Sequence, residues 1–272
     1  MKFLIILALA VAASAFPEPQ LVLRNREMPV QDDIEGRITG GQKAAVGQFP
    51  YQVGLSLKLS ALSSAWCGGS LISNKWVLTA AHCTESVVSV TVYLGATVRT
   101  SPEVSHVVQK SGIIVHSGYN SKTLINDISL IQIPAVAFTS KIQVVALPAQ
   151  SGSYSTYENS EVVASGWGRT TDSATAVSSN LMYVYLKVIA NSVCAKTYGS
   201  TVTAGNICVA TPSGQSTCQG DSGGPLVLTS SKIQVGLTSF GAAAGCEKGY
   251  PAAFTRITSF LPWIKSNTGI SF

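Results

Sequence analysis

The sequence predicts an all-β fold, an antiparallel sandwich or barrel, with one short helix at its carboxyl end. The first observation is alternation: apolar residues occupy every second position in segments such as 53–59 and 90–94 and, interrupted at Ile131, in 128–133. The second is that turns rich in Gly, Ser, Asn and Pro separate these segments, a pattern typical of antiparallel sheets. The third is length, because 272 residues can bury a core in one large all-β unit or two moderate domains.

The carboxyl-terminal segment 259–267 departs from the strand pattern. Its apolar residues recur at helical spacing: Phe260, Leu261, Trp263 and Ile264. This spacing predicts a short helix that packs on the last sheet.

The amino-terminal residues 1–15 have the pattern of a secretory signal peptide. Lys2 supplies a positive charge, an apolar run follows, and Ala13-Ser14-Ala15 gives a small-x-small cleavage site. The apolar run is too short to span a bilayer. We therefore expect a secreted, extracellular protein that is cut after Ala15 and has no membrane partner.

Residues 16–37 differ in composition from the rest of the chain. Three prolines interrupt a polar stretch that ends in an acidic run before Arg37. Because prolines and unpaired charges disfavour packing, we expect an exposed leader without a packed element. Arg37 directly before the apolar Ile38 is a candidate proteolytic site.

All six cysteines lie beyond the signal peptide, at Cys67, Cys83, Cys194, Cys208, Cys218 and Cys246. An even number in an oxidising compartment predicts three disulfides, but six cysteines allow 15 pairings. No CxxC and no Cys/His cluster at zinc spacing occurs in the sequence. We expect no metal and no cofactor.

The formal net charge is +5, from 18 basic and 13 acidic residues. The basic residues are scattered singly rather than gathered in runs. This distribution argues against a nucleic-acid partner. We expect a monomer.

The segment from Gly220 to Pro225 places one serine, Ser222, among three glycines. Glycines permit close approach of a substrate to the backbone. A serine hydroxyl is a weak nucleophile unless a base removes its proton. Of three histidines, His82 follows the small residues Thr79-Ala80-Ala81, which leave an imidazole open to a cleft, whereas His106 and His116 lie in ordinary segments.

A catalytic histidine needs an anion that fixes its tautomer. Beyond residue 37 the sequence has three aspartates, Asp127, Asp172 and Asp221. Asp172 lies in a polar stretch typical of a surface loop, and Asp221 directly precedes Ser222. Asp127 begins an apolar segment where a charge is costly without a partner, so it is the better candidate.

Four segments together resemble the signatures of the chymotrypsin-like serine proteases. They are Ile38–Gly41, Trp76–Cys83, Asp127–Leu130 and Gly220–Pro225, in the order that the family has. The resemblance spans nearly all of residues 38–272. It implies two antiparallel six-stranded β-barrels, at about 38–145 and 146–258, with the active site in the cleft between them and a C-terminal helix.

The resemblance also implies the roles of the site residues. His82 would be the general base and acid, Asp127 its orienting carboxylate and Ser222 the nucleophile. The N–H groups of Gly220 and Ser222 would form the oxyanion hole.

By the same resemblance, the disulfides would be Cys67–Cys83, Cys194–Cys208 and Cys218–Cys246. A trypsin-like protease would cut after Arg37, and the new α-amine of Ile38 would pair with Asp221. Residues 16–37 would then be an activation propeptide, and because no cysteine precedes Cys67 the released propeptide should dissociate.

The implied substrate pocket has Ser216 at its floor, where a trypsin-like enzyme carries an aspartate. A neutral floor disfavours a basic P1 side chain. Ser239, Phe240 and Gly241 match the strand that pairs with the substrate backbone, and Ala252 replaces a glycine of the wide chymotrypsin pocket. We expect cleavage after large apolar residues, with an elastase-like preference as the alternative.

The proposed enzyme is a secreted endopeptidase that acts on protein and peptide substrates and is open to protein protease inhibitors. Its short leader resembles that of insect digestive enzymes of the gut lumen. Two alternatives are a catalytically silent homologue that serves as a binding protein and a regulatory-cascade protease.

Overall fold

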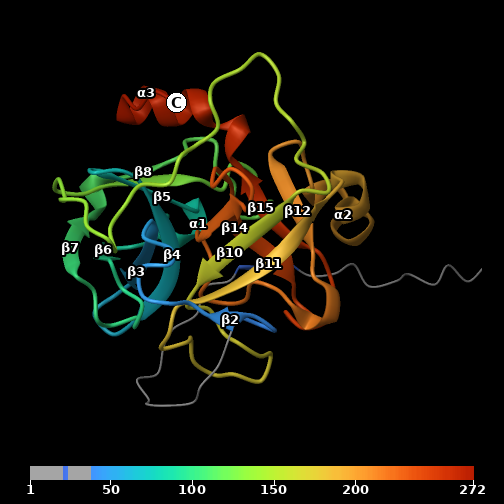
Figure 1. Ribbon diagram of the computed structural model, residues 1–272, viewed down its shortest axis with the longest axis horizontal. Helices are drawn as coiled ribbons and strands as arrows, with labels where there is room; N and C mark the ends of the chain where they lie inside the picture. The colour runs from blue at the N-terminus through green and yellow to red at the C-terminus, as the bar shows by residue number, and fades with distance from the viewer. Residues whose placement is uncertain (1–20, 24–37) are drawn as a thin grey trace, which may run out of the picture.

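The computed structural model describes residues 21–23 and 38–272. The predicted signal peptide 1–15, Arg37 and most of the predicted propeptide lie outside the described residues. Two antiparallel sheets make up most of the fold and lie side by side (Figure 1). Among the helices of the described residues, none has the length and apolar character needed to span a bilayer.

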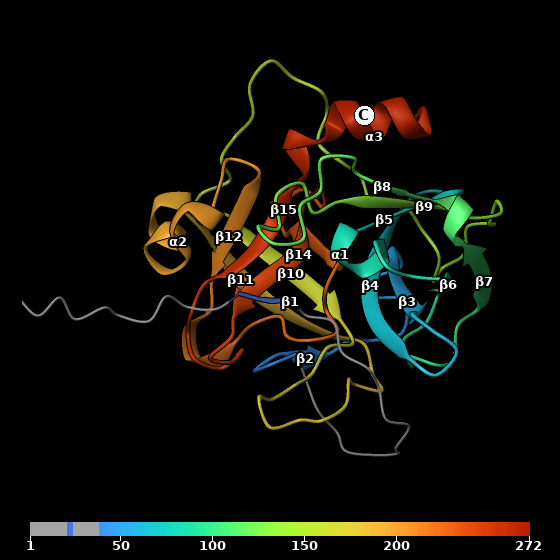
Figure 2. The ribbon, with the colours of Figure 1, turned by 180° about the vertical axis from the view of Figure 1, so that it is seen from behind.

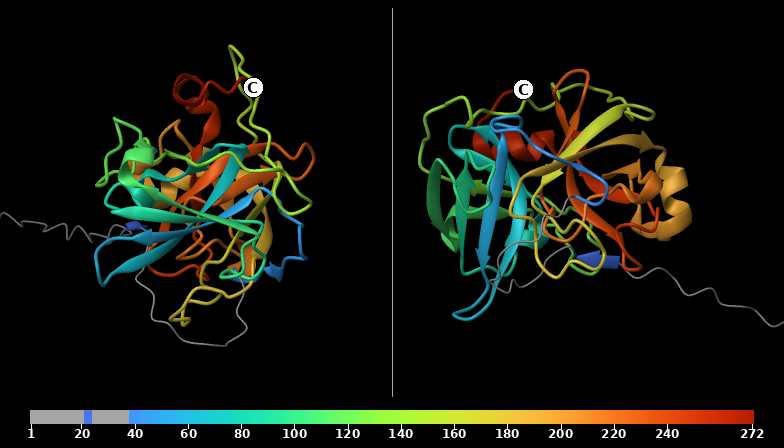
Figure 3. Two further views of the ribbon diagram at one scale, coloured as in Figure 1. Left: turned by 90° about the vertical axis from the view of Figure 1, so that its left-hand side faces the viewer. Right: turned by 60° about the horizontal axis from the view of Figure 1, so that its bottom comes forward.

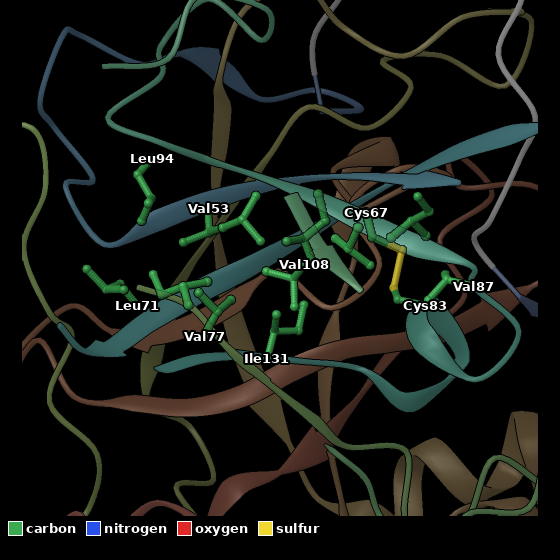
Figure 4. Close-up of a cluster of buried hydrophobic side chains, with 14 of the residues drawn as sticks. Val53, Cys67, Leu71, Val77, Cys83, Val87, Leu94, Val108 and Ile131 are labelled. Atoms are coloured by element: carbon green, nitrogen blue, oxygen red, sulfur yellow. A yellow bond between two sulfur atoms is a disulfide. The ribbon is translucent and has the colours of Figure 1, made fainter. Parts of the chain in front are cut away.

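The first sheet comes from the amino-terminal half and has the order β7-β6-β3-β4-β5-β9-β8. Its strands are β3 (Gln52–Lys58), β4 (Ser64–Ser73), β5 (Trp76–Thr79), β6 (Ser89–Leu94), β7 (Val104–Gln109), β8 (Ile113–Val115) and β9 (Ser129–Gln132). Alternate residues point inward, so that Val53, Leu55 and Leu57 are completely buried. Figure 4 shows part of this core, which includes a disulfide between Cys67 and Cys83.

The second sheet closes on itself. Its strands are β10 (Glu161–Gly166), β11 (Met182–Ile189), β12 (Asn206–Ala210), β13 (Pro225–Leu228), β14 (Gln234–Ala242) and β15 (Ala252–Arg256). Because β14 pairs with both β13 and β15, these six strands form a closed barrel. The prediction of an all-β fold with two antiparallel barrel-like units is therefore confirmed, although the first sheet has seven strands instead of six.

Two short strands from the amino-terminal part of the chain join the second sheet. β2 (Gln42–Lys43) pairs with β11, and Ile38 is completely buried in the core of the closed barrel. The chain therefore starts against the second barrel before it builds the first, which differs from the predicted boundary at residue 38. β1 (Leu21–Leu23) pairs with β14.

The expectation that residues 16–37 contain no packed element is wrong for β1. Leu, Val and Leu are apolar, and valine has a high strand propensity. Strand edges bind extended segments through backbone hydrogen bonds, which do not require a particular sequence.

Helices are few in the described residues and lie at the margins of the sheets. They are α1 (Ala81–Thr84), α2 (Asn191–Tyr198) and α3 (Leu261–Thr268), together with the 3-10 turns η1 (Lys110–Gly112), η2 (Gly199–Thr201), η3 (Pro212–Gly214) and η4 (Ile257–Ser259). The predicted C-terminal helix is confirmed as α3, which ends where Gly269 adopts a left-handed conformation, with φ of +72°. Figure 1 and Figure 3 show α3 on the outside of the molecule, where Ile264 joins an apolar cluster shared by both sheets.

That shared cluster holds the two units together. Leu130 of β9 and Leu237 of β14 belong to it and are completely buried. Across the same junction, the Ser165 hydroxyl donates a hydrogen bond to Gln52 Oε1 at 2.6 Å. A site built from both units therefore has a fixed geometry.

Candidate active site

His82 lies in α1, the single helical turn that follows β5. Strand β5 is buried along its whole length and pairs with β4 on one edge and with β9 on the other, and the chain turns into α1 directly after it. The disulfide from Cys83 to Cys67 of β4 holds this turn against the sheet. Figure 2 shows α1 between the two units. The sequence thus places the imidazole at the junction of the two sheets.

Asp127 lies just before β9 and contacts His82 in two ways. Its Oδ2 lies 2.8 Å from His82 Nδ1, and its Oδ1 accepts a hydrogen bond from the His82 backbone N–H at 2.9 Å. Two residues of the second barrel also bind it: the Ser239 hydroxyl donates to Oδ2 at 2.6 Å, and the Thr255 hydroxyl donates to the Asp127 carbonyl oxygen at 2.7 Å. The aspartate therefore connects both units.

The Asp127 carboxyl is completely enclosed, at 1 % exposure. Burial by itself raises the pKa of this carboxyl, but the nearby His82 and the hydrogen bonds from His82 and Ser239 outweigh it, so that the pKa lies below its usual value of 3.8. The aspartate is held as the anion, and an anion at Nδ1 keeps the proton of a neutral imidazole on that nitrogen and leaves Nε2 as the basic atom.

Ser222 lies in a tight turn that packs on the first sheet. Its carbonyl oxygen accepts a hydrogen bond from the N–H of Gly68 in β4 at 2.7 Å. The next residue, Gly223, has φ of +73°, and a Cβ there would lie only 3.0 Å from the backbone nitrogen of Ala80. Glycine is therefore required at this position, because the turn lies directly against the chain that leads into His82. The Ser222 hydroxyl is buried and has no hydrogen-bond partner within the described residues.

Gly220 adopts a conformation that other residues resist, with φ of +98°. A Cβ there would lie 2.6 Å from Val177 Cγ1. Throughout residues 38–272, no carbonyl or side chain accepts a hydrogen bond from the N–H of Gly220 or from that of Ser222. Backbone donors without an internal acceptor are the kind of group that stabilises a developing oxyanion.

Asp221 is completely buried, and backbone N–H groups bind its carboxylate. Its Oδ1 accepts a hydrogen bond from the N–H of Gly168 at 2.7 Å, and its Oδ2 accepts one from the N–H of Cys218 at 2.9 Å. A Cβ on Gly166 or Gly168 would collide with this carboxylate. The segment after the predicted cleavage point is close, because Thr39 pairs with Ser216, near Asp221 in the sequence.

The residues predicted for the substrate pocket lie on adjoining elements of the second barrel. Ser216 is buried, and its hydroxyl donates to the Thr217 carbonyl oxygen at 2.9 Å. Phe240 and Gly241 follow Ser239 on β14, and Ala252 begins the neighbouring β15. The disulfides that the resemblance implied are all present, as Cys67–Cys83, Cys194–Cys208 and Cys218–Cys246.

Two clusters in the described residues have the residue types of a metal site. They are Cys67, His82 and Cys83, and Asp172, Cys218 and Cys246. In each cluster both sulfur atoms are joined in a disulfide and offer no thiolate, the form in which cysteine binds metals.

The sequence did not reveal four contributors to this site. Gly166 and Gly168 enclose Asp221, and the hydroxyls of Ser239 and Thr255 bind Asp127. Ser239 was predicted only as part of the substrate-binding strand. Two glycines on either side of Trp167 indicate a close backbone approach, but the group that approaches them is distant in the sequence.

The fold, with a histidine held by a buried aspartate next to a turn that carries a serine, is of the kind found in serine hydrolases. The Trypsin family model matches residues 38–264, and the chain belongs to the trypsin family. Like its relatives in that family, it is a serine endopeptidase.

Individual relatives align with the sequence of this chain over most of its length. The protein is 44% identical over 274 residues to "Collagenase" of Hypoderma lineatum, an alignment that covers all of both chains. It is 48% identical to "Serine protease 1" of Drosophila melanogaster, over 88% of this chain and 89% of that protein. The solved structure "HL collagenase" matches with a TM-score of 0.81 and 44% identity, over 86% of this chain and 100% of that chain.

Proposed function

We propose that this endopeptidase cleaves peptide bonds through His82, Asp127 and Ser222. The observation that carries the proposal is the pair of His82 and Asp127, which share two hydrogen bonds. The Ser222 turn lies close to this pair, because it packs on β4 and on the end of β5, directly before His82. A buried anion on Nδ1 makes Nε2 the base for a serine hydroxyl that has no other partner among the described residues.

The chemical steps follow from these positions. Ser222 Oγ attacks the carbonyl carbon of the substrate while His82 Nε2 takes its proton, and the oxyanion receives hydrogen bonds from the N–H groups of Gly220 and Ser222. The imidazolium then donates this proton to the leaving amine, and the C–N bond breaks. Water, deprotonated by His82, hydrolyses the acyl-enzyme and restores Ser222.

The substrate preference rests on Ser216 and Ala252. Ser216 is neutral and its hydroxyl already binds a backbone carbonyl, so a basic P1 side chain would be buried without a counter-charge. Ala252 adds a methyl group where the wide chymotrypsin pocket has glycine. We infer a preference for large apolar P1 residues, with Ser239, Phe240 and Gly241 pairing with the substrate backbone.

The protein is made, in this proposal, as a secreted zymogen for extracellular digestion of proteins, such as in a gut lumen. A trypsin-like protease cuts after Arg37, and the α-amine of Ile38 pairs with the buried Asp221. This pairing draws Gly220 into its oxyanion geometry. Asp221→Asn should leave the cut intact and remove most turnover.

The test is activation by trypsin followed by a fluorophosphonate probe and a peptide library. We expect labelling at Ser222 only after the cut, and faster hydrolysis after Phe, Tyr or Leu than after Arg or Ala. Ser222→Ala should be cut normally and remain inert. A preference for Arg would overturn the pocket assignment, and labelling that does not require Ser222 would overturn the nucleophile.

One relative suggests a particular substrate. The Hypoderma protein that matches over its whole length is a "Collagenase", and we propose collagen as a candidate substrate here. The activated enzyme should cleave native collagen below its melting temperature. Cleavage of heat-denatured collagen alone would reject this substrate while leaving the endopeptidase assignment in place.

A further inference from the structure

Strand β1, from the segment before Arg37, lies against the strand proposed to bind substrate. It runs antiparallel to β14, with Leu21 opposite Ala242, Val22 opposite Gly241 and Leu23 opposite Phe240. Figure 2 shows β1 beside the closed barrel. Phe240 and Gly241 are two of the three residues assigned above to the substrate backbone.

This stretch of β14 has an edge that the barrel itself leaves open. The pairing of β13 with β14 ends at Leu237, opposite Pro225. Beyond it, the Ser222 turn occupies the edge for one residue, because the N–H of Gly223 donates to the carbonyl oxygen of Thr238 at 2.8 Å. An extended segment can therefore add to the edge from Phe240 outward.

The open edge of β14 begins next to the proposed catalytic groups. Ser239 lies between the residue that binds the Ser222 turn and the residues that pair with β1, and its hydroxyl binds Asp127 at 2.6 Å. A peptide that extends along this edge toward Ser239 therefore reaches Ser222. Since each strand edge binds one extended chain at a time, β1 and a substrate exclude each other.

We propose that the leader is an intramolecular inhibitor whose strand Leu21–Leu23 occupies the substrate-binding edge of β14. This inference rests on the proposed function, which assigns that edge to the substrate. It adds a second control to the cut after Arg37, because a strand of the uncut chain covers the substrate-binding edge.

The covalent connection of β1 to the enzyme, through residues 24–37, decides whether so short a strand stays bound to β14. A short covalent linker between a binding segment and its site gives an effective concentration in the millimolar range. A contact of millimolar affinity is thus well populated while residues 24–37 connect β1 to the enzyme and is lost when the cut peptide is diluted. No cysteine precedes Cys67 to retain it, so cutting both matures the enzyme and removes the inhibitor.

The first test uses hydrogen exchange in the full chain kept uncut by Arg37→Gln. The double variant Val22→Pro, Leu23→Pro removes two of the three backbone N–H donors of β1, whereas Val22→Ala, Leu23→Ala keeps all three. We expect the amides of 240–242 to exchange about tenfold faster in the proline variant than in the alanine control. Equal exchange in both variants would overturn the proposal.

The second test adds the synthetic peptide 16–37 to the enzyme of residues 38–272. We expect competitive inhibition, a higher KM at unchanged kcat, with an inhibition constant in the millimolar range and a proline peptide about tenfold weaker. No inhibition at about 5 mM, or equal inhibition by both peptides, would refute it. If the enzyme hydrolyses no peptide at all, the proposed function fails instead, and the exchange experiment still decides where β1 binds.

Discussion

Gly168→Ala is a substitution far from the serine in sequence that should disable it through Asp221. The Gly168 N–H donates to Asp221 Oδ1 at 2.7 Å. An added Cβ would lie 2.7 Å from that oxygen and nearer still to Oδ2, whereas ordinary contact begins at 3.4 Å. Asp221 is completely buried, so its carboxylate has to move. Because Asp221 lies between Gly220 and Ser222 in the chain, this movement also shifts the backbone of both neighbours.

The expected magnitude follows from two costs. Forcing an extra carbon into a packed site costs about 1–3 kcal/mol of stability. Displacing the Gly220 N–H from the oxyanion costs about 3 kcal/mol of transition-state stabilisation, which corresponds to roughly a hundredfold in rate. We therefore expect kcat to fall about a hundredfold while KM changes little, because the substrate-binding edge of β14 is not touched.

The assay compares kcat, KM and the rate of fluorophosphonate labelling for the activated enzymes, with thermal unfolding measured in parallel. Gly152→Ala is the matched control, since a Cβ there would meet no atom within 4 Å, and its kinetics should equal those of the parent. A folded Gly168→Ala enzyme with kcat within about threefold of the parent would refute the coupling of Asp221 to the oxyanion hole.

Three further substitutions probe the same network. Ser239→Ala removes one hydrogen bond to the buried Asp127 carboxylate, which should cost about 1.5–3 kcal/mol of stability. The control Ser70→Ala removes a buried hydroxyl that has no partner within the described residues and should be close to neutral. Urea unfolding measures the free energy of unfolding of both variants. Since the pKa of Asp127 lies below its usual 3.8, its charge stabilises the fold above that pH, and this contribution should disappear as pH falls below 3.8 through the lowered pKa; the difference in unfolding free energy between parent and Asp127→Asn should shrink there, and a constant difference would contradict the assignment. Asp172→Ala removes the acceptor for the Cys246 N–H, at 2.6 Å. It should raise KM for a Phe substrate about three- to tenfold with little change in kcat. An unchanged KM would mean that the Cys218–Cys246 disulfide alone holds this wall of the substrate pocket.

The parts of the site that the sequence predicted are those with a local chemical signature. His82 follows three small residues, Ser222 lies among glycines, and Asp127 is a charge at the start of an apolar segment. Each pattern has a direct physical reason. The contact between His82 and Asp127 then follows because β5 and β9 are neighbours in the sheet.

The parts that the sequence did not predict depend on partners far away in the chain. Gly168 is required because Asp221, 53 residues further on, lies against it. Asp172 was interpreted as an ordinary surface residue, yet its carboxylate accepts a hydrogen bond from the N–H of Cys246. Composition around Gly168 and Asp172 carries no information about these contacts, because only the closed barrel brings the segments together.

In the leader, residues 16–37, part of the structure follows from the local sequence and part depends on a partner far away in the chain. Its prolines and charges correctly argue against a stable element in isolation, since a strand of three residues cannot order itself. The open edge of β14 supplies the missing hydrogen bonds, and the tether supplies the concentration. A segment that binds only in the millimolar range as a free peptide can thus cover the active site until the chain is cut. Lengthening the linker should therefore weaken the inhibition that cutting removes: doubling residues 24–37 with a flexible insertion before Ile38 lowers the effective concentration about threefold. Exchange at Gly241 should increase accordingly, even in the uncut chain.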